Sequence, residues 1–436
     1  MFEKLSIQHI PDDKRHGKVF SVFTLWLASN LTIADYALGS LFYGLPFKYI
    51  VLLITIGNIL GGLLLALAVA MGPKLGYPQM MISQGVFGKL GNKPFAAMNW
   101  VSTAGWYTVN IILGSYALEL LAGFNFIEAA VLLSVVQALL ALYGYDIIHH
   151  FERAMAVVLG LLFVSGIAVI YPAFNSHLQQ YEASSSFNPY YFALVLAAVF
   201  SYLMSWAPYA SDYSRYLGSE TSKFKLIFYA LLGGVLASGL SELFGVMVFI
   251  TAGNPSLNAI EATYRLGGTI AYVAVTAIVL GALAANALNL YTNSLSAVTF
   301  YQRTRRSLAV LLAVFVGFFL ALFGQASFGT FYEDFLLTLD YWITPWLGIM
   351  IASFYITKMI KPESVEAASN IYMKSIASYL IAIIISIPFM NLSSYGIPFE
   401  GPVAGLLNGA DISYFVSFLL AMVLSILFQS KNRKYI

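Results

Sequence analysis

Residues 26–35 read Trp26-Leu27-Ala28-Ser29-Asn30-Leu31-Thr32-Ile33-Ala34-Asp35, and they interrupt an apolar stretch that extends over residues 18–44. Small and polar side chains occupy the middle of this stretch, where a membrane helix would cross the hydrocarbon. A polar group without a partner costs about 2–7 kcal/mol in an apolar environment, so membrane proteins place such groups against other helices or a cavity. The stretch therefore predicts a membrane helix that is broken near its middle.

A second apolar stretch, residues 190–211, is interrupted by Ser201-Tyr202 and by Ser205-Trp206-Ala207-Pro208. Proline removes a backbone donor and kinks a helix, and either interruption alone also fits an ordinary kinked helix. The two stretches hold matching places, because each is the first of five predicted spans. Five spans start and end on opposite sides of a membrane, so a repeat of this length is inverted, which is a common plan of secondary transporters.

The composition is that of a membrane protein. Hydrophobic residues make up 60% of the 436 residues and charged residues 10%, whereas soluble domains typically carry about 25% charge. The mean hydropathy is +0.79. The net charge of +2 gives no sign of a nucleic-acid partner, and the absence of cysteine excludes disulfides and thiolate catalysis. We expect no cofactor other than a coupling cation.

A helix needs about 20 apolar residues to cross the bilayer, and this length divides the chain into twelve spans. We place them at 18–44, 48–71, 95–121, 127–145, 154–172, 190–211, 225–251, 269–298, 307–324, 331–357, 372–390 and 411–429. The predicted fold is an all-α integral membrane protein with two inverted five-helix repeats, residues 18–172 and 190–357. Two additional helices follow in 372–429. Residues 1–17 form a cytoplasmic N-terminal segment and 430–436 a cytoplasmic tail.

Basic residues predict the orientation, because cytoplasmic loops are rich in Lys and Arg. With the N-terminus in the cytoplasm, every Lys and Arg except Lys48 and Arg265 falls in an inner segment. An odd number of missed spans would destroy this pattern. We therefore expect both termini to be cytoplasmic and the protein to lie in the cell (plasma) membrane as a multi-pass protein.

Polar groups on the third and eighth spans indicate a binding site in mid-membrane. Thr103, Trp106 and Asn110 are spaced three and four apart and share one helix face. Asn286, Asn289 and Asn293 do the same on the eighth span, with Thr292 and Ser296 beside them. An indole and several amides suit a flat heteroaromatic ligand, because an amide both donates and accepts and a base stacks on an aromatic ring. The alternative is a polar seam between two packed helices.

The chain resembles the purine–cytosine permease group of nucleobase–cation symporters. The resemblance extends over most of the chain and lies in the following runs: Trp26 to Asp35, Gly57-Asn58, Met71-Gly72-Pro73-Lys74-Leu75-Gly76, Phe87-Gly88, Gly105-Trp106, Pro208-Tyr209-Ala210-Ser211-Asp212-Tyr213-Ser214-Arg215-Tyr216, and Asn286 with Asn289-Leu290-Tyr291-Thr292. It implies a LeuT-type fold of twelve helices with two inverted five-helix repeats.

The resemblance also implies roles for individual residues. Trp106 would stack on the substrate, and Asn110, Asn289 and Thr103 would contact it. We add Asn286 to this set, and the unwound part of the sixth span would supply the opposite wall as Tyr202 or Phe200.

The coupling ion stays open between sodium and a proton. In sodium-dependent relatives the ion joins the first span to the eighth, which here implies the carbonyls of Ala28 and Leu31. The candidate ligands on the eighth span are Asn289, Thr292 and Asn293, where Asn293 replaces a second hydroxyl residue. Glu242, Asp35 and Asp340 lie inside predicted spans and are candidate proton carriers, although each could be a buried structural partner instead.

These observations predict a secondary active transporter, not an enzyme, that imports a nucleobase or related heterocycle. Cytosine or a purine is favoured, with cation-coupled alternating access and a monomer in the lipid bilayer as the functional unit. The alternative of the same fold is an amino-acid or amine symporter, which would use a free helix N-terminus for a carboxylate. An intramembrane enzyme would need converging catalytic groups, and a passive channel would not concentrate its substrate.

Overall fold

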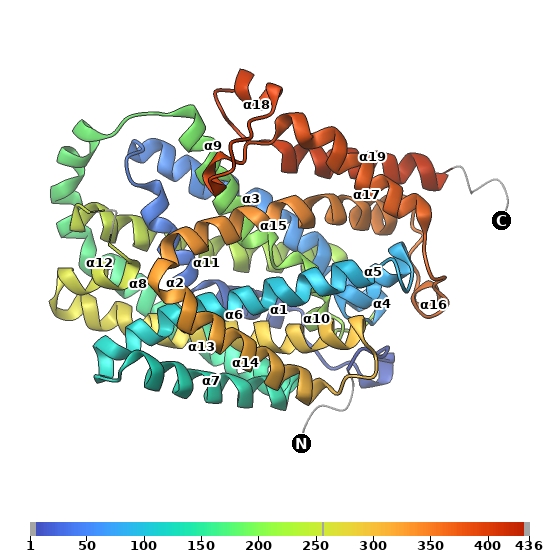
Figure 1. The fold of residues 1–436 in the computed structure, drawn as a ribbon. Helices are drawn as coiled ribbons and strands as arrows, with labels where there is room; N and C mark the ends of the chain where they lie inside the picture. The colour runs from blue at the N-terminus through green and yellow to red at the C-terminus, as the bar shows by residue number, and fades with distance from the viewer. Residues whose placement is uncertain (1–5, 255–256, 431–436) are drawn as a thin grey trace.

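The computed structural model describes residues 6–254 and 257–430, and within these ranges the protein is helical apart from two isolated β-bridges, Gly17–Leu217 and Asn391–Glu400. The long helices lie side by side (Figure 1). Their bounds are α3 Phe47–Val69, α6 Lys93–Ala122, α7 Phe126–Tyr143, α8 Tyr145–Ser184, α11 Lys223–Ala252, α13 Gly268–Phe300, α14 Arg306–Gly324, α15 Phe328–Ile351, α17 Met373–Ser386 and α19 Ser413–Ser430.

Short helices connect or extend the long ones. They are η1 Asp12–Lys14, α4 Met71–Leu75, α5 Gln79–Phe87, α12 Ala259–Leu266, η4 Gln325–Ser327, the π-helix η5 Ala352–Ile356, α16 Pro362–Glu366, η6 Ile387–Phe389, η7 Ser393–Tyr395 and α18 Pro402–Leu406. In Figure 1, α12 lies at the left end of the helices and α4, α5 and α16 lie at the right end. We call these the α12 end and the α16 end.

Seven helical stretches within the described ranges are long and apolar enough to cross a membrane: Phe47–Leu75, Phe126–Tyr143, Ile147–Ser184, Pro189–Ser214, Lys223–Ala252, Ala271–Phe300 and Arg306–Ile356. Large apolar side chains cover the outside of the bundle, including Phe224, Leu161 and Phe323. An exposed apolar surface of this kind is matched by lipid rather than water. The fold is therefore that of a multi-pass membrane protein. Helix α6 is absent from this set because polar residues interrupt its apolar run.

Both predicted helix breaks are present. The first span consists of α1 (Phe20–Asn30), α2 (Ile33–Ala37) and η2 (Leu38–Phe42). Between α1 and α2, Thr32 is extended, and its side chain caps α2 by accepting a hydrogen bond from the backbone N–H of Asp35. The second broken stretch consists of α9 (Pro189–Met204), η3 (Ala207–Tyr209) and α10 (Ala210–Ser214).

The long helix α8 differs from its predicted boundary. We expected a span that ends at residue 172, but α8 continues through Pro172 to Ser184. Proline removes one backbone hydrogen bond and bends a helix without necessarily ending it, and the polar residues after Pro172 extend α8 beyond the predicted apolar stretch. Of the predicted terminal segments 1–17 and 430–436, residues 1–5 and 431–436 lie outside the described residues.

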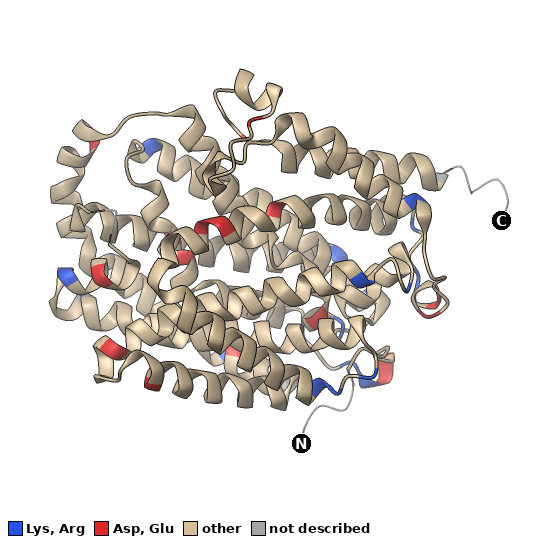
Figure 2. Ribbon diagram, in the orientation of Figure 1, with Lys and Arg blue, Asp and Glu red and all other residues tan. Residues whose placement is uncertain are grey.

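Charged residues are distributed unevenly along the helix axes. Lys and Arg gather at the α16 end and are few toward the opposite end (Figure 2). Arg265 belongs to α12 itself, and Lys48 lies in the first turn of α3. This is the distribution that the predicted orientation requires, and it places the predicted inner segments together in space.

Candidate functional site

Helices α6 and α13 are antiparallel and are joined by amide side chains. The Nδ2 of Asn286 donates to the carbonyl of Tyr107 (3.0 Å) and to Oε1 of Gln137 (3.2 Å). About two turns further along α13, Nδ2 of Asn293 donates to the carbonyl of Trp100 (2.7 Å) and to Oγ1 of Thr103 (2.9 Å). These are interhelical contacts, so three residues that we predicted as substrate or ion ligands hold the two helices in register.

Other polar atoms of the same two helices are left unpaired. Trp106, Asn110 and Asn289 are buried, with 4%, 2% and 1% of their surface exposed. Among the described residues, the Nε1 of Trp106 and the Oδ1 atoms of Asn110 and Asn289 have no hydrogen-bond partner. Because Asn289 lies between Asn286 and Asn293 on the same helix face, it also faces α6. A buried polar group without a partner requires an explanation, and a bound ligand supplies one.

Aromatic rings surround the indole of Trp106. Tyr202 of α9 meets it edge-on with ring centroids 5.4 Å apart, and Phe335 of α15 does so at 5.2 Å. Tyr332 of α15 lies at 6.3 Å. Tyr202 was predicted for this wall, whereas Tyr332 and Phe335 were not. The only sequence signal for them is the spacing of aromatic residues on α15, which is equally typical of a packed core.

Phe200 does not belong to this wall. Its ring stacks on Tyr414 at 5.7 Å and lies 5.1 Å from Phe415, and both partners are on α19. Positions 200 and 202 differ by about 200° around a helix, so the structure brings only Tyr202 to Trp106.

The first helix break lies against the aromatic rings. Oγ1 of Thr32 and the hydroxyl of Tyr202 form a hydrogen bond of 2.7 Å, and the hydroxyl of Tyr332 donates to the carbonyl of Ala34 (2.5 Å). Two of the rings beside Trp106 are therefore tied to the backbone or cap of the break. Movement of the break would move the walls of the site.

The structure does not bring the predicted sodium ligands together. A Cβ atom built on Gly281 of α13 would lie 2.7 Å from the carbonyl oxygen of Leu31, so the break faces Gly281. Thr292 lies 11 residues further along α13, about 16 Å at 1.5 Å per residue. Its hydroxyl donates to Oδ2 of Asp212 (2.8 Å) and contacts the hydroxyl of Tyr213. Ala28 is buried within α1.

The three candidate proton carriers lie in two places. Asp35 of α2 and Glu242 of α11 are both completely buried and interact with each other. Asp340 of α15 is separate. It borders a cavity of about 30 Å³ together with Tyr341 and Asp411, and it faces Ser201.

Cavities lie at both ends of the helices, and two at the α16 end have volumes of about 420 and 380 Å³. A cavity of about 630 Å³ opens at the α12 end, where Ser40, Asn258, Glu261 and Gln325 line it and where it reaches Tyr332. Since Tyr332 also contacts Trp106, this cavity leads from the α12 end toward the unpaired polar atoms.

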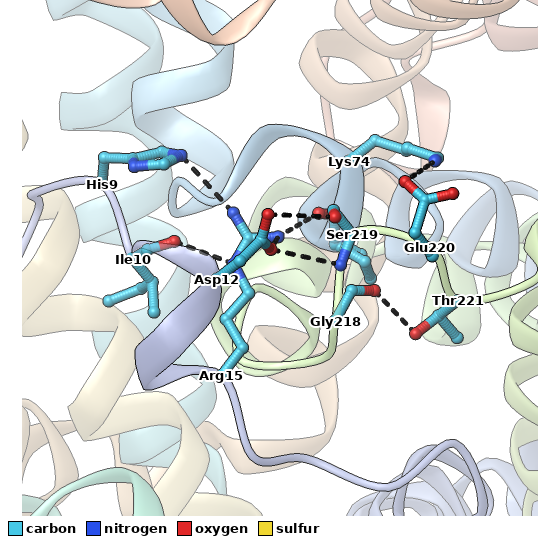
Figure 3. A network of polar contacts seen from close by, with 10 residues as sticks. His9, Ile10, Asp12, Arg15, Lys74, Gly218, Ser219, Glu220 and Thr221 are labelled. Atoms are coloured by element: carbon cyan, nitrogen blue, oxygen red, sulfur yellow. Dashed lines mark hydrogen bonds and ion pairs between the residues drawn. The ribbon is translucent and has the colours of Figure 1, made fainter.

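The α16 end is tied together by the N-terminal segment (Figure 3). The carboxylate of Asp12 pairs with Arg15 (3.1 Å) and accepts a hydrogen bond from the hydroxyl of Ser219 (3.1 Å), while Lys74 pairs with Glu220 (3.5 Å). Burial and the neighbouring Arg15 lower the pKa of His9. The segment thus joins the connections that follow α4 and α10.

Comparison with known proteins agrees with this architecture. The family model described as "Permease for cytosine/purines, uracil, thiamine, allantoin" matches residues 9–417. The putative purine-cytosine permease YxlA of Bacillus subtilis is 26% identical over 97% of this chain and 94% of its own length. The purine-cytosine permease fcyB of Emericella nidulans is 25% identical over 96% of this chain and 86% of its own.

A solved structure shows the same fold. It is a nucleobase-cation-symport-1 family transporter in a closed conformation with bromovinylhydantoin bound, and it matches with a TM-score of 0.80 and 17% identity. The match covers 99% of this chain and 96% of that transporter. Together with the family model, it shows that the chain belongs to the family of permeases for cytosine, purines, uracil, thiamine and allantoin.

Proposed function

We propose that this protein is a secondary active transporter that imports a nucleobase or a closely related heterocycle by alternating access. The base would stack on Trp106, with Tyr202 and Phe335 beside it. The observation that carries the proposal is the set of buried, unpaired polar atoms on the two facing helices, which includes the Nε1 of this indole. One donor (Nε1 of Trp106) and two amide acceptors (Asn110 and Asn289) face a dry interior, and the edge of a nucleobase offers matching C=O and N–H groups.

An amino acid is a weaker candidate substrate for this site. Amino acids carry a carboxylate, which a broken-helix transporter can hold at a free half-helix N-terminus. Here the N-terminus of α2 is already capped, because Oγ1 of Thr32 accepts the N–H of Asp35 at 3.3 Å. The unpaired groups beside Trp106 are neutral, so they favour a neutral planar ligand.

The membrane arrangement follows the same proposal. The long helices overlap the predicted spans, whereas α5, α12 and α16 lie between them. We propose that the long helices form two five-span units in which α1–α2 and α9–α10 hold matching places. We propose that these units are inverted repeats in the plasma membrane, and that the basic α16 end with both termini is cytoplasmic. The cavity at the α12 end would then be the outer vestibule. The site lies within one chain, so a monomer would suffice.

Uptake into vesicles tests the proposal. The purified protein would be reconstituted into liposomes and supplied with radiolabelled cytosine, with hypoxanthine, uracil, allantoin and hydantoin as competitors and leucine and phenylalanine as controls. We expect saturable uptake that at least one heterocycle inhibits and neither amino acid affects. Uptake of leucine, or no binding of any heterocycle in a thermal-shift screen, would overturn the assignment.

Cation coupling makes uptake concentrative. If the ion and the base each favour the same conformation, each raises the affinity for the other by the same factor. The family implies a coupling cation, and the positions of the buried carboxyl groups bear on which cation it is.

A further inference from the structure

Asp35 and Glu242 form a carboxyl pair in the middle of the bundle. Both side chains are completely buried, Asp35 on α2 and Glu242 on α11. Oε2 of Glu242 accepts a hydrogen bond from Nδ2 of Asn58 (2.7 Å). The two side chains belong to packed helices, because the ring of Tyr36, next to Asp35, meets that of Phe244 of α11 with centroids 5.2 Å apart. The electrostatic interaction of Asp35 with Glu242 agrees with this placement. Even so, neither oxygen of Asp35 nor Oε1 of Glu242 completes a well-formed hydrogen bond with another described residue.

The pair has no positive neighbour among the described residues. The titratable groups that face it are Tyr202 of α9 and Tyr332 of α15, both phenols, and no Lys, Arg or His interacts with either carboxyl. Two adjacent carboxylates in a dry interior cannot both remain charged without a cation. The pair must therefore hold a proton, and it loses one only if the bundle opens or rearranges.

Close backbone contact places this pair against the first helix break. A Cβ atom on Gly245 of α11 would lie 2.1 Å from the carbonyl oxygen of Tyr36, so only glycine fits there. The hydroxyl of Ser241, next to Glu242, donates to the carbonyl of Asn30 at the end of α1 (3.0 Å). Helix α11 is thus attached to both sides of the break.

The same break holds the walls of the substrate site. Thr32 caps α2 through the N–H of Asp35 and also bonds to Tyr202 (2.7 Å). Tyr332 donates to Ala34, the residue before Asp35. Both phenol rings contact Trp106. A change of charge at Asp35 therefore acts on the element that positions two walls of the site.

The part of α13 that faces the break is unsuited to a sodium ion. Leu31 faces Gly281, and residues 277–285 of α13 (AIVLGALAA) have no side-chain oxygen. Sodium is a hard cation and needs oxygen ligands. This observation does not depend on the carboxyl pair, and it favours a proton as the coupling ion.

We propose that Asp35 and Glu242 together bind the coupling proton, and that this proton and the base are carried inward in the same cycle. The inference rests on the proposed function for the substrate but names the ion and its site. No bond is made or broken other than to the proton, which binds to a carboxylate oxygen on the outer side and is released to water on the inner side.

Accumulation in proteoliposomes measures the coupling. One pH unit across the membrane, acidic outside, should drive about tenfold accumulation of the base if one proton moves with each molecule. The double variant Asp35→Asn, Glu242→Gln should show no accumulation, yet still exchange internal for external base. The matched control is Glu152→Gln, since Glu152 is another completely buried carboxyl without a hydrogen-bond partner among the described residues; it should accumulate base like the parent protein.

Three results would overturn the assignment. They are pH-driven accumulation by the double variant, loss of accumulation on Asp340→Asn while the double variant retains it, and accumulation by the parent protein that follows a sodium gradient and ignores pH.

A readout without substrate separates this inference from the proposed function. Because the chain has no cysteine, Ser40→Cys places a unique thiol in the cavity at the α12 end. Its labelling rate, divided by that of the exposed control Ser186→Cys to correct for thiol ionisation, should change between acidic and alkaline pH and should be constant in the double variant. An equal pH response in both proteins would overturn the carboxyl assignment whichever base is carried.

Discussion

The amides of α6 and α13 divide into two pairs according to where their N–H groups donate. Asn286 and Asn293 donate across the helix contact, whereas Asn110 donates to its own helix at Trp106 and leaves its oxygen free. The Asn289 side chain donates to Oδ1 of Asn286 (3.1 Å), and its oxygen has no partner among the described residues. The first pair forms a seam between the helices through its N–H groups, and the second pair does not, although the two share helices, burial and residue type. A free oxygen alone does not distinguish them, because Oδ1 of Asn293 also lacks a partner among the described residues. The difference lies in whether the facing helix supplies the acceptor.

The largest effect should follow from Trp106→Ala, which removes the surface on which the base stacks. Stacking of a base on an aromatic side chain contributes about 1–3 kcal/mol, so the Kd for the base should rise by about 5–150-fold and uptake at low concentration should be strongly reduced. Isothermal titration and vesicle uptake measure this. Phe200→Leu is the matched control, because that ring packs on α19; equal losses in the two variants would refute the stacking role.

A somewhat smaller effect on affinity is expected for Asn289→Ala. This change removes one free acceptor, and a ligand N–H left unpaired in a dry site costs about 1–3 kcal/mol. The Kd should rise about fivefold or more, while the melting temperature without ligand should fall less than that of Asn286→Ala, because only the hydrogen bond to Oδ1 of Asn286 is lost. An unchanged Kd would place Asn289 in the seam instead.

The opposite pattern is expected for Asn286→Ala. Its removal leaves the carbonyl of Tyr107 and Oε1 of Gln137 without this donor, and each buried unpaired group costs about 1–3 kcal/mol of stability. The unfolding midpoint in detergent should fall, and the Kd of the protein that remains folded should be nearly unchanged. A large rise in Kd with an unchanged midpoint would show that Asn286 contacts the substrate.

The smallest effect should come from Asp12→Asn at the α16 end, outside both amide pairs. The Asp12 side chain is 63% exposed, and exposed ion pairs contribute about 0–1 kcal/mol. We expect a small change in the unfolding midpoint and normal affinity for the base. A fall as large as that of Asn286→Ala would mean that the N-terminal segment stabilises the whole bundle.

The helix breaks could be predicted from the sequence because their cause is local. Ser29-Asn30 and Pro208 disturb a helix wherever it packs, and the structure has breaks at both places. The end of α8 could not be placed, since Pro172 and the polar residues after it do not by themselves stop a helix.

Which contact each side chain makes depends on residues that are distant in the sequence. Spacing puts Asn286, Asn289 and Asn293 on one face, but only the register of α13 against α6 decides which of them meets a carbonyl. Likewise, the antiparallel register of α1 and α13 sets Leu31 opposite Gly281 rather than Thr292. Tyr332 and Phe335 could not be predicted as site residues, because aromatic residues in an apolar helix are equally typical of a packed core and of a binding site.

The contact of Gly39 with Gly245 limits how the molecule can open. A Cβ on either glycine would lie within 2.3 Å of the opposing backbone. Because the two backbones are in such close contact, we expect α2–η2 and α11 to move together as one rigid body. Spin labels on these two helices should therefore keep a constant separation through the transport cycle. Distances from a label on α11 to a label on α15 should change.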